Sequence, residues 1–478
     1  MANSSRTTRR KHTADQASTR NTGVENDSTN IANILLTRRG FLYGIAGVAA
    51  AAAVGTAAFA ATGGFSPKHD TPALSVPTSS VFTTDNCEYI ENNQALRVVT
   101  SVSLPYGTMV WASDPSVAAC LLPTETGKPL TNVGLISLSA GTCRTILDKA
   151  HGQSDGFEIY DARATSSGLI WTEADILDGN WRVYQATLSG AQLGEPVLMH
   201  EGDTNWEMPT LAASGNYAFW QVLPQLNGNA TKEDSLMMCV EFGGSPEAAR
   251  TLYTSHGRMA CSPSPSASGI ACAPRADTSD TRYQLTHIDA ATGEVTDALA
   301  LPASMRPIYV AYGESGFAFS FDGIYNYGDG IANLGTYTPA SAPTYDLKTA
   351  TADAQNSLRD KNGQLSERNA EEANARAAQA VADLYSSSTW FRFPRTPVTP
   401  PAWYNNWFVV KSTRAVSGVD LGAKRYFALD VENGAPDYGE FLASYGTCQN
   451  LVTYTNIDYT PINGDPIKEC RMKVWKTV

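Results

Sequence analysis

Short apolar runs alternate with clusters of Gly, Pro, Asn and Asp along most of the chain after residue 94. Clear examples are 133–138 (VGLISL), 168–172 (GLIWT), 215–222 (GNYAFWQV), 316–321 (GFAFSF) and 406–411 (NWFVVK). Short runs rich in β-branched and aromatic residues, bounded by turn residues, are typical of strands. The pattern predicts an all-β fold built from many short strands.

One segment of the chain occurs twice. His151–Trp171 and His200–Trp220 align without a gap, with His, Glu (Glu158 and Glu207), Ala and Trp at matching places. A Ser-Gly pair before an apolar run also recurs at positions 167, 214, 268 and 315, which is a period of about 50 residues. Periods near this length are typical of propellers and repeat arrays.

The count of strands predicts how the propeller closes. A spare strand at 95–102 precedes the first set of four, whereas the last set, with 449–455 and 470–475, is short of strands. Strand 95–102 can complete the last blade, which removes the exposed edges of an open array. We therefore predict a β-propeller of seven four-stranded blades over 94–478, with six or eight as alternatives because the fifth and sixth blades are poorly marked.

Two stretches carry a family resemblance. Pro209 with Ser214–Phe219 (SGNYAF) provides the first half of a repeat, and Tyr283 and Leu285 before His287–Gly293 (HIDAATG) provide the second. Together they resemble TolB-like and WD40-like propeller repeats over about 100–345 and 400–478. The resemblance implies the propeller architecture and no particular activity.

Residues 349–386 interrupt the strand pattern. From residue 353 to 385 the segment is rich in Ala, Glu, Gln and Arg, lacks Pro, and favours helix. We predict helices at about 353–361 and 365–385, separated by Gly363. The insertion is either a lid or docking hairpin, or a solvated extension without a specific role.

The N-terminus resembles a twin-arginine export signal. A paired-arginine motif precedes an uncharged, Ala-rich run that ends in a small-x-small site, so the residues that would direct export and cleavage are Arg38, Arg39, Phe41, Leu42, Ala58 and Ala60. The predicted organisation is a disordered extension (1–36), the signal (37–60), a linker and lead-in (61–93), and the propeller. The resemblance implies the twin-arginine translocase and a signal peptidase as partners, and an extracellular or cell-envelope location.

The alternative is that the signal segment is never cut. An uncharged run over residues 41–61 can span a bilayer core of about 30 Å, and the arginines would hold the N-terminus in the cytoplasm. The protein would then be anchored in the cytoplasmic membrane. Cleavage after Ala60 is the preferred interpretation because Ala and Gly are weakly apolar.

The chain is acidic, with a formal net charge of −12. Residues 1–60 are basic, so the remainder is more acidic still. A negative surface repels phosphate backbones, which excludes nucleic acid from the expected partners.

The eight cysteines show no metal-finger spacing. An even number in an exported chain favours disulfides, and the preferred pairs are local in sequence: Cys120–Cys143, Cys261–Cys272 and Cys448–Cys470. Buried free thiols are the alternative.

Histidines precede three successive blades. His151, His200 and His256 would lie at blade linkers on one face, with Glu158 and Glu207 near the channel. Histidine and carboxylate on one rim could bind a divalent metal, and no other cofactor is evident. The alternative is that each histidine forms hydrogen bonds within its own blade linkage.

Aromatic residues gather after the helical insertion. Trp390, Trp403, Tyr404 and Trp407 could stack on sugar rings at a rim, or could form the core between blades.

Two functions remain open from the sequence. The preferred one is a non-catalytic binding or scaffolding propeller for a protein or glycan ligand, because no convergent catalytic set is recognisable. The alternative is an extracytoplasmic carbohydrate-active enzyme, a metal-assisted lyase or a hydrolase, with its site at the channel mouth.

Overall fold

The structure is a computed structural model that describes residues 81–478, apart from 228–231, 277–281, 302–305, 314–315, 322–333, 337–346, 387–389, 393–396 and 463. The described residues all belong to one compact unit. The export signal with Arg38, Arg39, Phe41, Leu42, Ala58 and Ala60 lies outside them. No helix among the described residues is long and apolar enough to cross a membrane.

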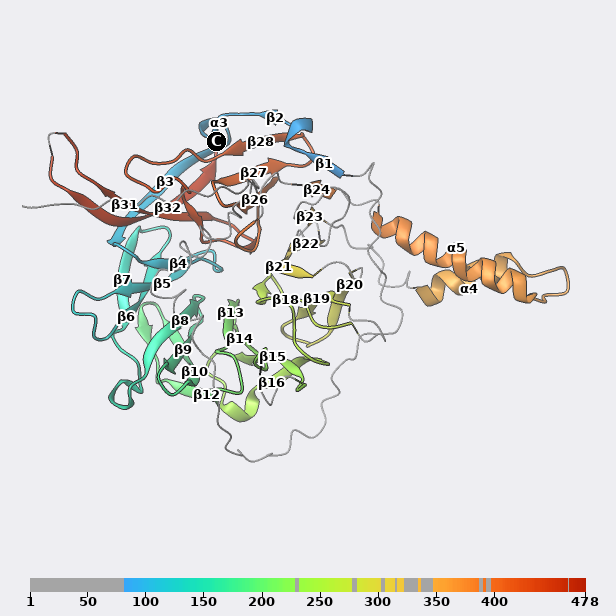
Figure 1. Cartoon of the computed structure of the whole chain (residues 1–478), viewed down its shortest axis with the longest axis horizontal. Coiled ribbons are helices and arrows are strands. Elements are labelled where there is room, and N and C mark those ends of the chain that lie inside the picture. The colour runs from blue at the N-terminus through green and yellow to red at the C-terminus, as the bar shows by residue number, and fades with distance from the viewer. Residues whose placement is uncertain are drawn as a thin grey trace, which may run out of the picture. The chain divides into compact units, whose positions relative to one another are not determined.

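The described strands form a β-propeller whose sheets follow one another along the chain (Figure 1). Blade 1 contains β4 (Met109–Trp111), β5 (Val117–Pro123), β6 (Thr131–Ser137) and β7 (Thr142–Leu147). Blade 2 contains β8 (Glu158–Ala164), β9 (Gly168–Asp175), β10 (Asn180–Ser189) and β12 (Val197–Gly202), with β11 (Gln192–Leu193) beside the end of β10. Blade 3 contains β13 (Thr210–Ser214), β14 (Tyr217–Val222), β15 (Ser235–Glu241) and β16 (Arg250–Ser255).

The later blades follow the same antiparallel order. Blade 4 contains β17 (Ser264–Pro265), β18 (Gly269–Cys272), β19 (Gln284–Asp289) and β20 (Val295–Ala300). The described part of blade 5 contains β21 (Pro307–Gly313), β22 (Gly316–Phe321) and β23 (Leu334–Thr336). Blade 6 contains β25 (Ala402–Tyr404), β26 (Trp407–Lys411), β27 (Val416–Asp420) and β28 (Arg425–Ala428). Together with the last blade, the described residues form seven propeller blades, beside a separate two-stranded sheet of β1 (Val81–Thr83) and β24 (Trp390–Arg392), and the predicted all-β propeller is confirmed.

The last blade closes the ring with the spare N-terminal strand. Blade 7 contains β29 (Phe441–Leu442), β31 (Leu451–Tyr459), β32 (Ile467–Thr477) and β3 (Leu96–Pro105). The pairing of β3 with β32 runs from Leu96 opposite Thr477 to Pro105 opposite Glu469. The predicted closure by strand 95–102 is therefore observed.

The described part of the 61–93 lead-in is structured. It contains β1 (Val81–Thr83), the 3-10 turn η2 (Thr84–Asn86), β2 (Glu88–Tyr89) and the start of α3 (Asn92–Ala95). Strand β1 pairs in parallel with β24 (Trp390–Arg392), and β2 adds a parallel strand to the outer edge of blade 6. This arrangement covers an edge that would otherwise be open.

The core lies between neighbouring blades. Separate clusters of buried apolar side chains join blades 1 and 2, 3 and 4, 4 and 5, 5 and 6, 6 and 7, and finally 7 and 1. Between blades 2 and 3, Phe242 packs so closely on Gly168 that a Cβ there would lie 2.1 Å from the ring. Successive side chains of a strand point to opposite faces of its sheet, and each face packs against a neighbouring blade. Both faces of the sheets are therefore buried, as a propeller requires.

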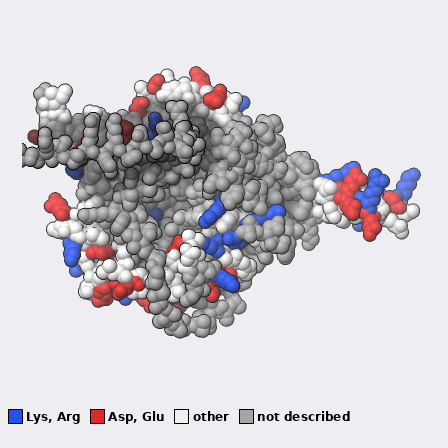
Figure 2. Space-filling model, in the orientation of Figure 1, with Lys and Arg blue, Asp and Glu red and all other residues white. Residues whose placement is uncertain are grey.

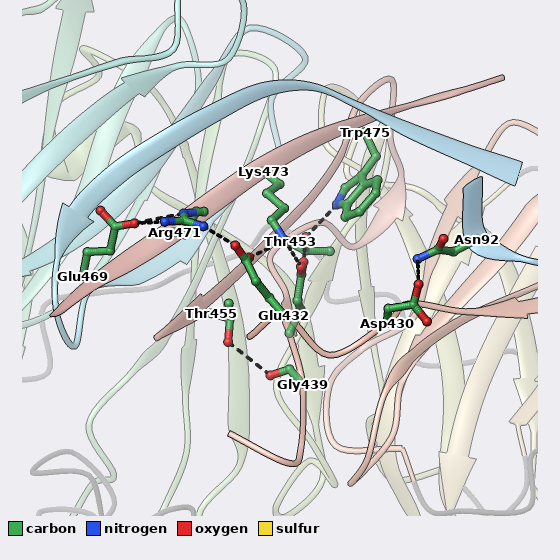
Figure 3. A network of polar contacts seen from close by, with 11 residues as sticks. Asn92, Asp430, Glu432, Gly439, Thr453, Thr455, Glu469, Arg471, Lys473 and Trp475 are labelled. Atoms are coloured by element: carbon green, nitrogen blue, oxygen red, sulfur yellow. Dashed lines mark hydrogen bonds and ion pairs between the residues drawn. The ribbon is translucent and has the colours of Figure 1, made fainter. Parts of the chain in front are cut away.

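A polar network fastens the connection between blades 6 and 7 (Figure 3). Lys473 of β32 pairs with Glu432 (2.7 Å) and with Glu440, whose side chain is 1% exposed. Arg471 bridges Glu432 and Glu469. Because the carboxylates and cations compensate one another, their charges are tolerated at low exposure.

The helical insertion is present as two packed helices. They are α4 (Leu347–Ser357) and α5 (Glu367–Ser386), and Ala373 and Ala377 are buried. The first helix ends earlier than predicted because Asp360 accepts hydrogen bonds from the backbone N–H groups of Asn362 and Gln364 and forms a turn. Gly363, with φ of +75°, lies in that turn.

Candidate functional site

The first repeated histidine fastens a blade junction through its backbone. The His151 N–H donates to Glu173 Oε1 (2.6 Å), and the Gly152 N–H donates to Glu173 Oε2 (2.9 Å). Trp171 Nε1 donates to the same carboxylate (2.9 Å), which is fully buried. The imidazole of His151 is exposed and lies beside Tyr184. The part that His151 plays at this blade junction is therefore structural and comes from its backbone N–H group.

The second repeated histidine, His200, takes part in its blade junction through its imidazole ring. His200 Nδ1 accepts a hydrogen bond from Trp220 Nε1 (3.1 Å), and the ring lies 5.5 Å from that of Trp181. Burial lowers the pKa of His200, and Glu201 partly opposes that shift. The neutral imidazole is thus a fixed acceptor within its blade linkage.

The other predicted rim residues also have protein partners. His256 Nδ1 lies 3.4 Å from Asp234 Oδ1 at the surface, Glu158 accepts from the Leu130 N–H (2.9 Å), and Glu207 pairs with Arg258 (2.6 Å). In the described part of the chain, no three His, Cys, Asp or Glu side chains are grouped to hold a metal. The structure therefore does not bring the five predicted residues together.

The aromatic residues after the insertion belong to the core. Trp403, Tyr404 and Trp407 are 5%, 2% and 4% exposed. They pack in the clusters on the two faces of blade 6, so they offer no face to a sugar, and the stacking hypothesis is corrected for them. Trp390 pairs with Val81 through the backbone of β24, and its side chain lies outside the described residues.

The cysteines are free thiols in the structure. Cys120 and Cys143 come from β5 and β7, on either side of β6, and their sulphurs lie 3.7 Å apart above Gly134. Cys448 and Cys470 have different neighbours: the Cys448 thiol donates to the Trp403 carbonyl and the Cys470 thiol to the Thr108 carbonyl.

Burial keeps the remaining predicted thiol pair protonated. It raises the pKa of Cys261 to about 12, and the pKa of Cys272 still further. Among the described residues the structure thus contains none of the three predicted disulfides, although it places the sulphurs of Cys120 and Cys143 next to each other.

A segment of blade 7 occupies the centre of the propeller. Blades 3 and 6 join their first two strands through tight turns, whereas blade 7 uses residues 443–450. Within this segment Ser444 bridges to Ala112 of blade 1, and β30 (Gly446–Thr447) pairs with β25 of blade 6. Burial raises the pKa of Tyr445, and Arg163 of blade 2 partly opposes that shift.

Gly446 lets this segment approach blade 4. It has a φ of +65°, and an added Cβ would lie 2.4 Å from the Pro265 carbonyl oxygen. Only glycine accepts this conformation without strain at so close an approach. Segment 443–450 of blade 7 thus contacts blades 1, 4 and 6 and connects them near the propeller axis.

Basic side chains gather over β16–β20 on the face seen in Figure 2, whereas acidic ones lie over blades 1 and 2. Two arginines of the loops between β16 and β19 are bound to protein groups. Arg258 donates to the Pro224 carbonyl and to Glu207, and Arg275 lies 4.8 Å above the Tyr283 ring. These contacts give the arginines structural roles.

A cavity of about 520 Å³ lies where β14 begins and β15 ends, next to the β19–β20 turn. Its lining combines aromatic, charged and glycine residues: Tyr217, Val240, Glu241, Phe242, Gly243, Gly244, Ala248, Arg250 and Ala291. We call it the blade 3 pocket. Its volume is in the range of about 300–1,000 Å³ that is usual for small-molecule sites.

Contacts from both neighbouring blades hold the walls of the blade 3 pocket. Gln185 of blade 2 is fully buried, accepts from the Gly243 N–H (3.0 Å) and donates to the Gly244 carbonyl (2.9 Å). On the other side, Arg250 donates to the Ala290 carbonyl of blade 4. The pocket is therefore preorganised, which lowers the entropic cost of binding.

Sequence reasoning missed the blade 3 pocket. In the sequence Tyr217 stands out only as part of a repeat, and the Gly243-Gly244 pair after a strand is the one local sign of a close backbone approach. Gln185, which orders that loop, comes from a different blade, so sequence spacing does not reveal it.

Comparison with known proteins finds similarity of structure only. No family model matches the chain, and no curated protein matches it. A prolyl endopeptidase structure is 9% identical with a TM-score of 0.45, covering 78% of this chain and 46% of that one. An oligogalacturonate lyase in complex with manganese is 8% identical with a TM-score of 0.41, covering 79% and 97%. Prolyl oligopeptidase B from Galerina marginata is 9% identical with a TM-score of 0.42, covering 77% and 52%.

The chain spans about half the length of these two peptidase structures. At these identities the likeness is one of fold. The propeller assignment itself follows from the strand pairings described above.

Proposed function

We propose that this propeller is a non-catalytic binding module that holds a protein or glycan ligand in the blade 3 pocket. The observation that carries the proposal is a preformed cavity of about 520 Å³ whose walls are fastened to the blades on both sides. Tyr217 supplies aromatic surface, while Glu241 and Arg250 supply one acceptor group and one donor group. A few polar groups in a partly apolar cavity are typical of ligand sites.

The test is a binding screen of the full chain against immobilised glycans and peptides. Tyr217→Leu removes the aromatic ring with little change in volume. The affinity of any ligand that binds in the pocket should then fall by about 3- to 10-fold. His256→Ala is the matched control, because His256 is exposed at the opposite end of β16 from Arg250. If Tyr217→Leu leaves the affinity of every ligand found in the screen unchanged, the proposal is refuted.

We also propose that the chain is exported through the twin-arginine route and acts outside the cytoplasm. The support is the motif with Arg38, Arg39 and Phe41 before an uncharged run. Changing Arg38 and Arg39 together to Lys should retain the protein in the cytoplasm. The control is the same change at Arg9 and Arg10, which are paired but lack the following apolar run. Equal export of both variants would contradict this route.

A further inference from the structure

The lining of the blade 3 pocket narrows the chemistry of its ligand. We propose that the pocket binds one neutral pyranose residue of a glycan, an inference that rests on the proposed binding function. Four observations carry it: the side chains in the pocket, their opposite charges, the occupied backbone groups of its loop, and the fixed position of its walls.

The side chains of the pocket suit a ring that is apolar on its faces and polar at its edge. Tyr217 is partly exposed and provides the aromatic face, against which the C–H groups of a pyranose can pack, while the buried Val240 and Phe242 form the floor behind it. Glu241 can only accept hydrogen bonds and Arg250 can only donate them. A sugar hydroxyl does both, so one ring with several hydroxyls can satisfy the two side chains together.

The opposite charges of the pocket favour a neutral ligand. Glu241 is exposed, and its carboxylate would repel a uronate or a sulfated sugar. Arg250 would repel an amino sugar in the same way, although one of its nitrogens already donates to the Ala290 carbonyl. A ligand of one sign is therefore attracted by one of the two side chains and repelled by the other, so neither sign is favoured, whereas an uncharged ring can accept from Arg250 and donate to Glu241 without repulsion.

Three backbone groups of the pocket's loop already have protein partners. An extended peptide is usually held by main-chain hydrogen bonds, but the Gly243 N–H already donates to Gln185 and the Gly244 N–H to the Glu241 carbonyl. The Gly244 carbonyl is also occupied, by the Gln185 amide. The N–H groups of this loop are therefore not free to pair with a peptide main chain, whereas the side chains of the pocket can bind a sugar.

The glycines keep the pocket open in the shape described. A Cβ at Gly243 would lie 2.9 Å from Thr187, and one at Gly244 would lie 2.9 Å from Val240. Gly243 also has a φ of +85°, which favours glycine. The loop therefore has one well-defined conformation before any ligand arrives.

The experiment is calorimetric titration of the full chain with methyl glycosides and short oligomers of neutral hexoses, alongside a uronate, an amino sugar and an acetylated dipeptide. We expect binding of a neutral sugar that changes little between about 50 and 200 mM salt, since an uncharged ligand is not screened. Glu241→Ala should weaken it by about 5-fold or more, and Tyr217→Leu by about 3- to 10-fold. His256→Ala should leave it unchanged, and the thermal midpoint of each variant checks folding.

The outcomes separate this inference from the function on which it rests. Binding of the dipeptide or of a charged sugar, sensitive to Tyr217→Leu, with no binding of neutral sugars, would overturn the pyranose assignment and leave the binding module intact. If a neutral sugar binds with an affinity that neither Tyr217→Leu nor Glu241→Ala changes, the assignment to this pocket is overturned. If no ligand class responds to Tyr217→Leu, both proposals fail.

Discussion

The junctions that lead into blades 2 and 3 have the same histidine and tryptophan at the same spacing but different hydrogen bonds. In blade 2 the indole of Trp171 donates to the buried carboxylate of Glu173, two residues further along the same strand. In blade 3 the indole of Trp220 donates to the imidazole of His200, and the residue at the equivalent place is Val222. A valine cannot accept a hydrogen bond.

The difference shows how a repeat can keep a fold while it changes the chemistry that holds it. Most buried indole N–H groups are paired with an acceptor, and here the acceptor is the Glu173 carboxylate in one junction and the His200 imidazole in the other. Where Glu173 is present, the His151 ring is left at the surface and only its backbone N–H takes part. The repeated histidine is thus a side-chain partner in one junction and a backbone partner in the other.

The largest expected effect is at Glu173, which joins three N–H groups within a fully buried site. Glu173→Ala should lower the free energy of unfolding by about 3 to 5 kcal/mol, because each abandoned buried donor costs about 1 to 3 kcal/mol and part of that cost is relieved by water. Equilibrium urea denaturation measures the loss. Glu173→Gln, which keeps one acceptor oxygen, is the control and should lose less. A loss below about 1 kcal/mol for the alanine variant would contradict the role of Glu173.

The second effect separates the two histidines. His200→Ala should cost about 2 kcal/mol, since it leaves the Trp220 indole unpaired and opens space beside Trp181. His151→Ala should change the free energy of unfolding by no more than about 0.5 kcal/mol, because that ring is exposed. Urea denaturation of both variants makes the comparison. Equal losses would show that the two repeats are held in the same way after all.

Sequence patterns predicted the parts of the molecule that depend on local alternation. The β3 strand could be assigned to the last blade because 95–102 is an apolar run with no other partner, and the helices of the insertion follow from composition. The roles of Trp403 and Tyr404 could not be decided, since both faces of a propeller sheet are apolar and a sequence does not show which side chains are covered.

Other features depend on contacts between distant segments. Strands β2 and β30 have only two residues each and no periodicity, yet they extend blade 6 on both edges. Gln185 looked like an ordinary strand residue, and its role in the blade 3 pocket comes from a loop in the next blade. Glu173 was overlooked for the same reason, because its partners at His151 and Gly152 precede it by a whole strand.

A third, smaller effect is the pH dependence of the blade 3 junction. Burial holds the pKa of His200 below its ordinary value of 6.5, so the unfolded chain takes up a proton at a higher pH than the folded one does. The contribution of His200 to stability is therefore complete above about pH 6.5 and is lost as the pH falls through the folded pKa. Urea denaturation between pH 7.5 and 5 of the wild type and of His200→Asn measures it.

The difference between those two proteins isolates His200 from other groups. Burial also lowers the pKa of His287, to about 4, so His287 reduces stability over part of the same range in both proteins. We expect the wild type to lose more stability than His200→Asn as the pH falls. Parallel curves would show that His200 is not a neutral acceptor in the folded protein.

The smallest effect is expected at the third repeated histidine. His256 precedes blade 4, but no tryptophan follows it within that blade, and its side chain is 68% exposed, 3.4 Å from Asp234. An exposed ion pair of this kind contributes between about 0 and 1 kcal/mol. His256→Ala should therefore shift the free energy of unfolding by less than about 0.5 kcal/mol, measured in urea at pH 7.5. A loss comparable to that of His200→Ala would mean that the junction into blade 4 also depends on its histidine, and that a tryptophan donor is not what sets the importance of the repeat.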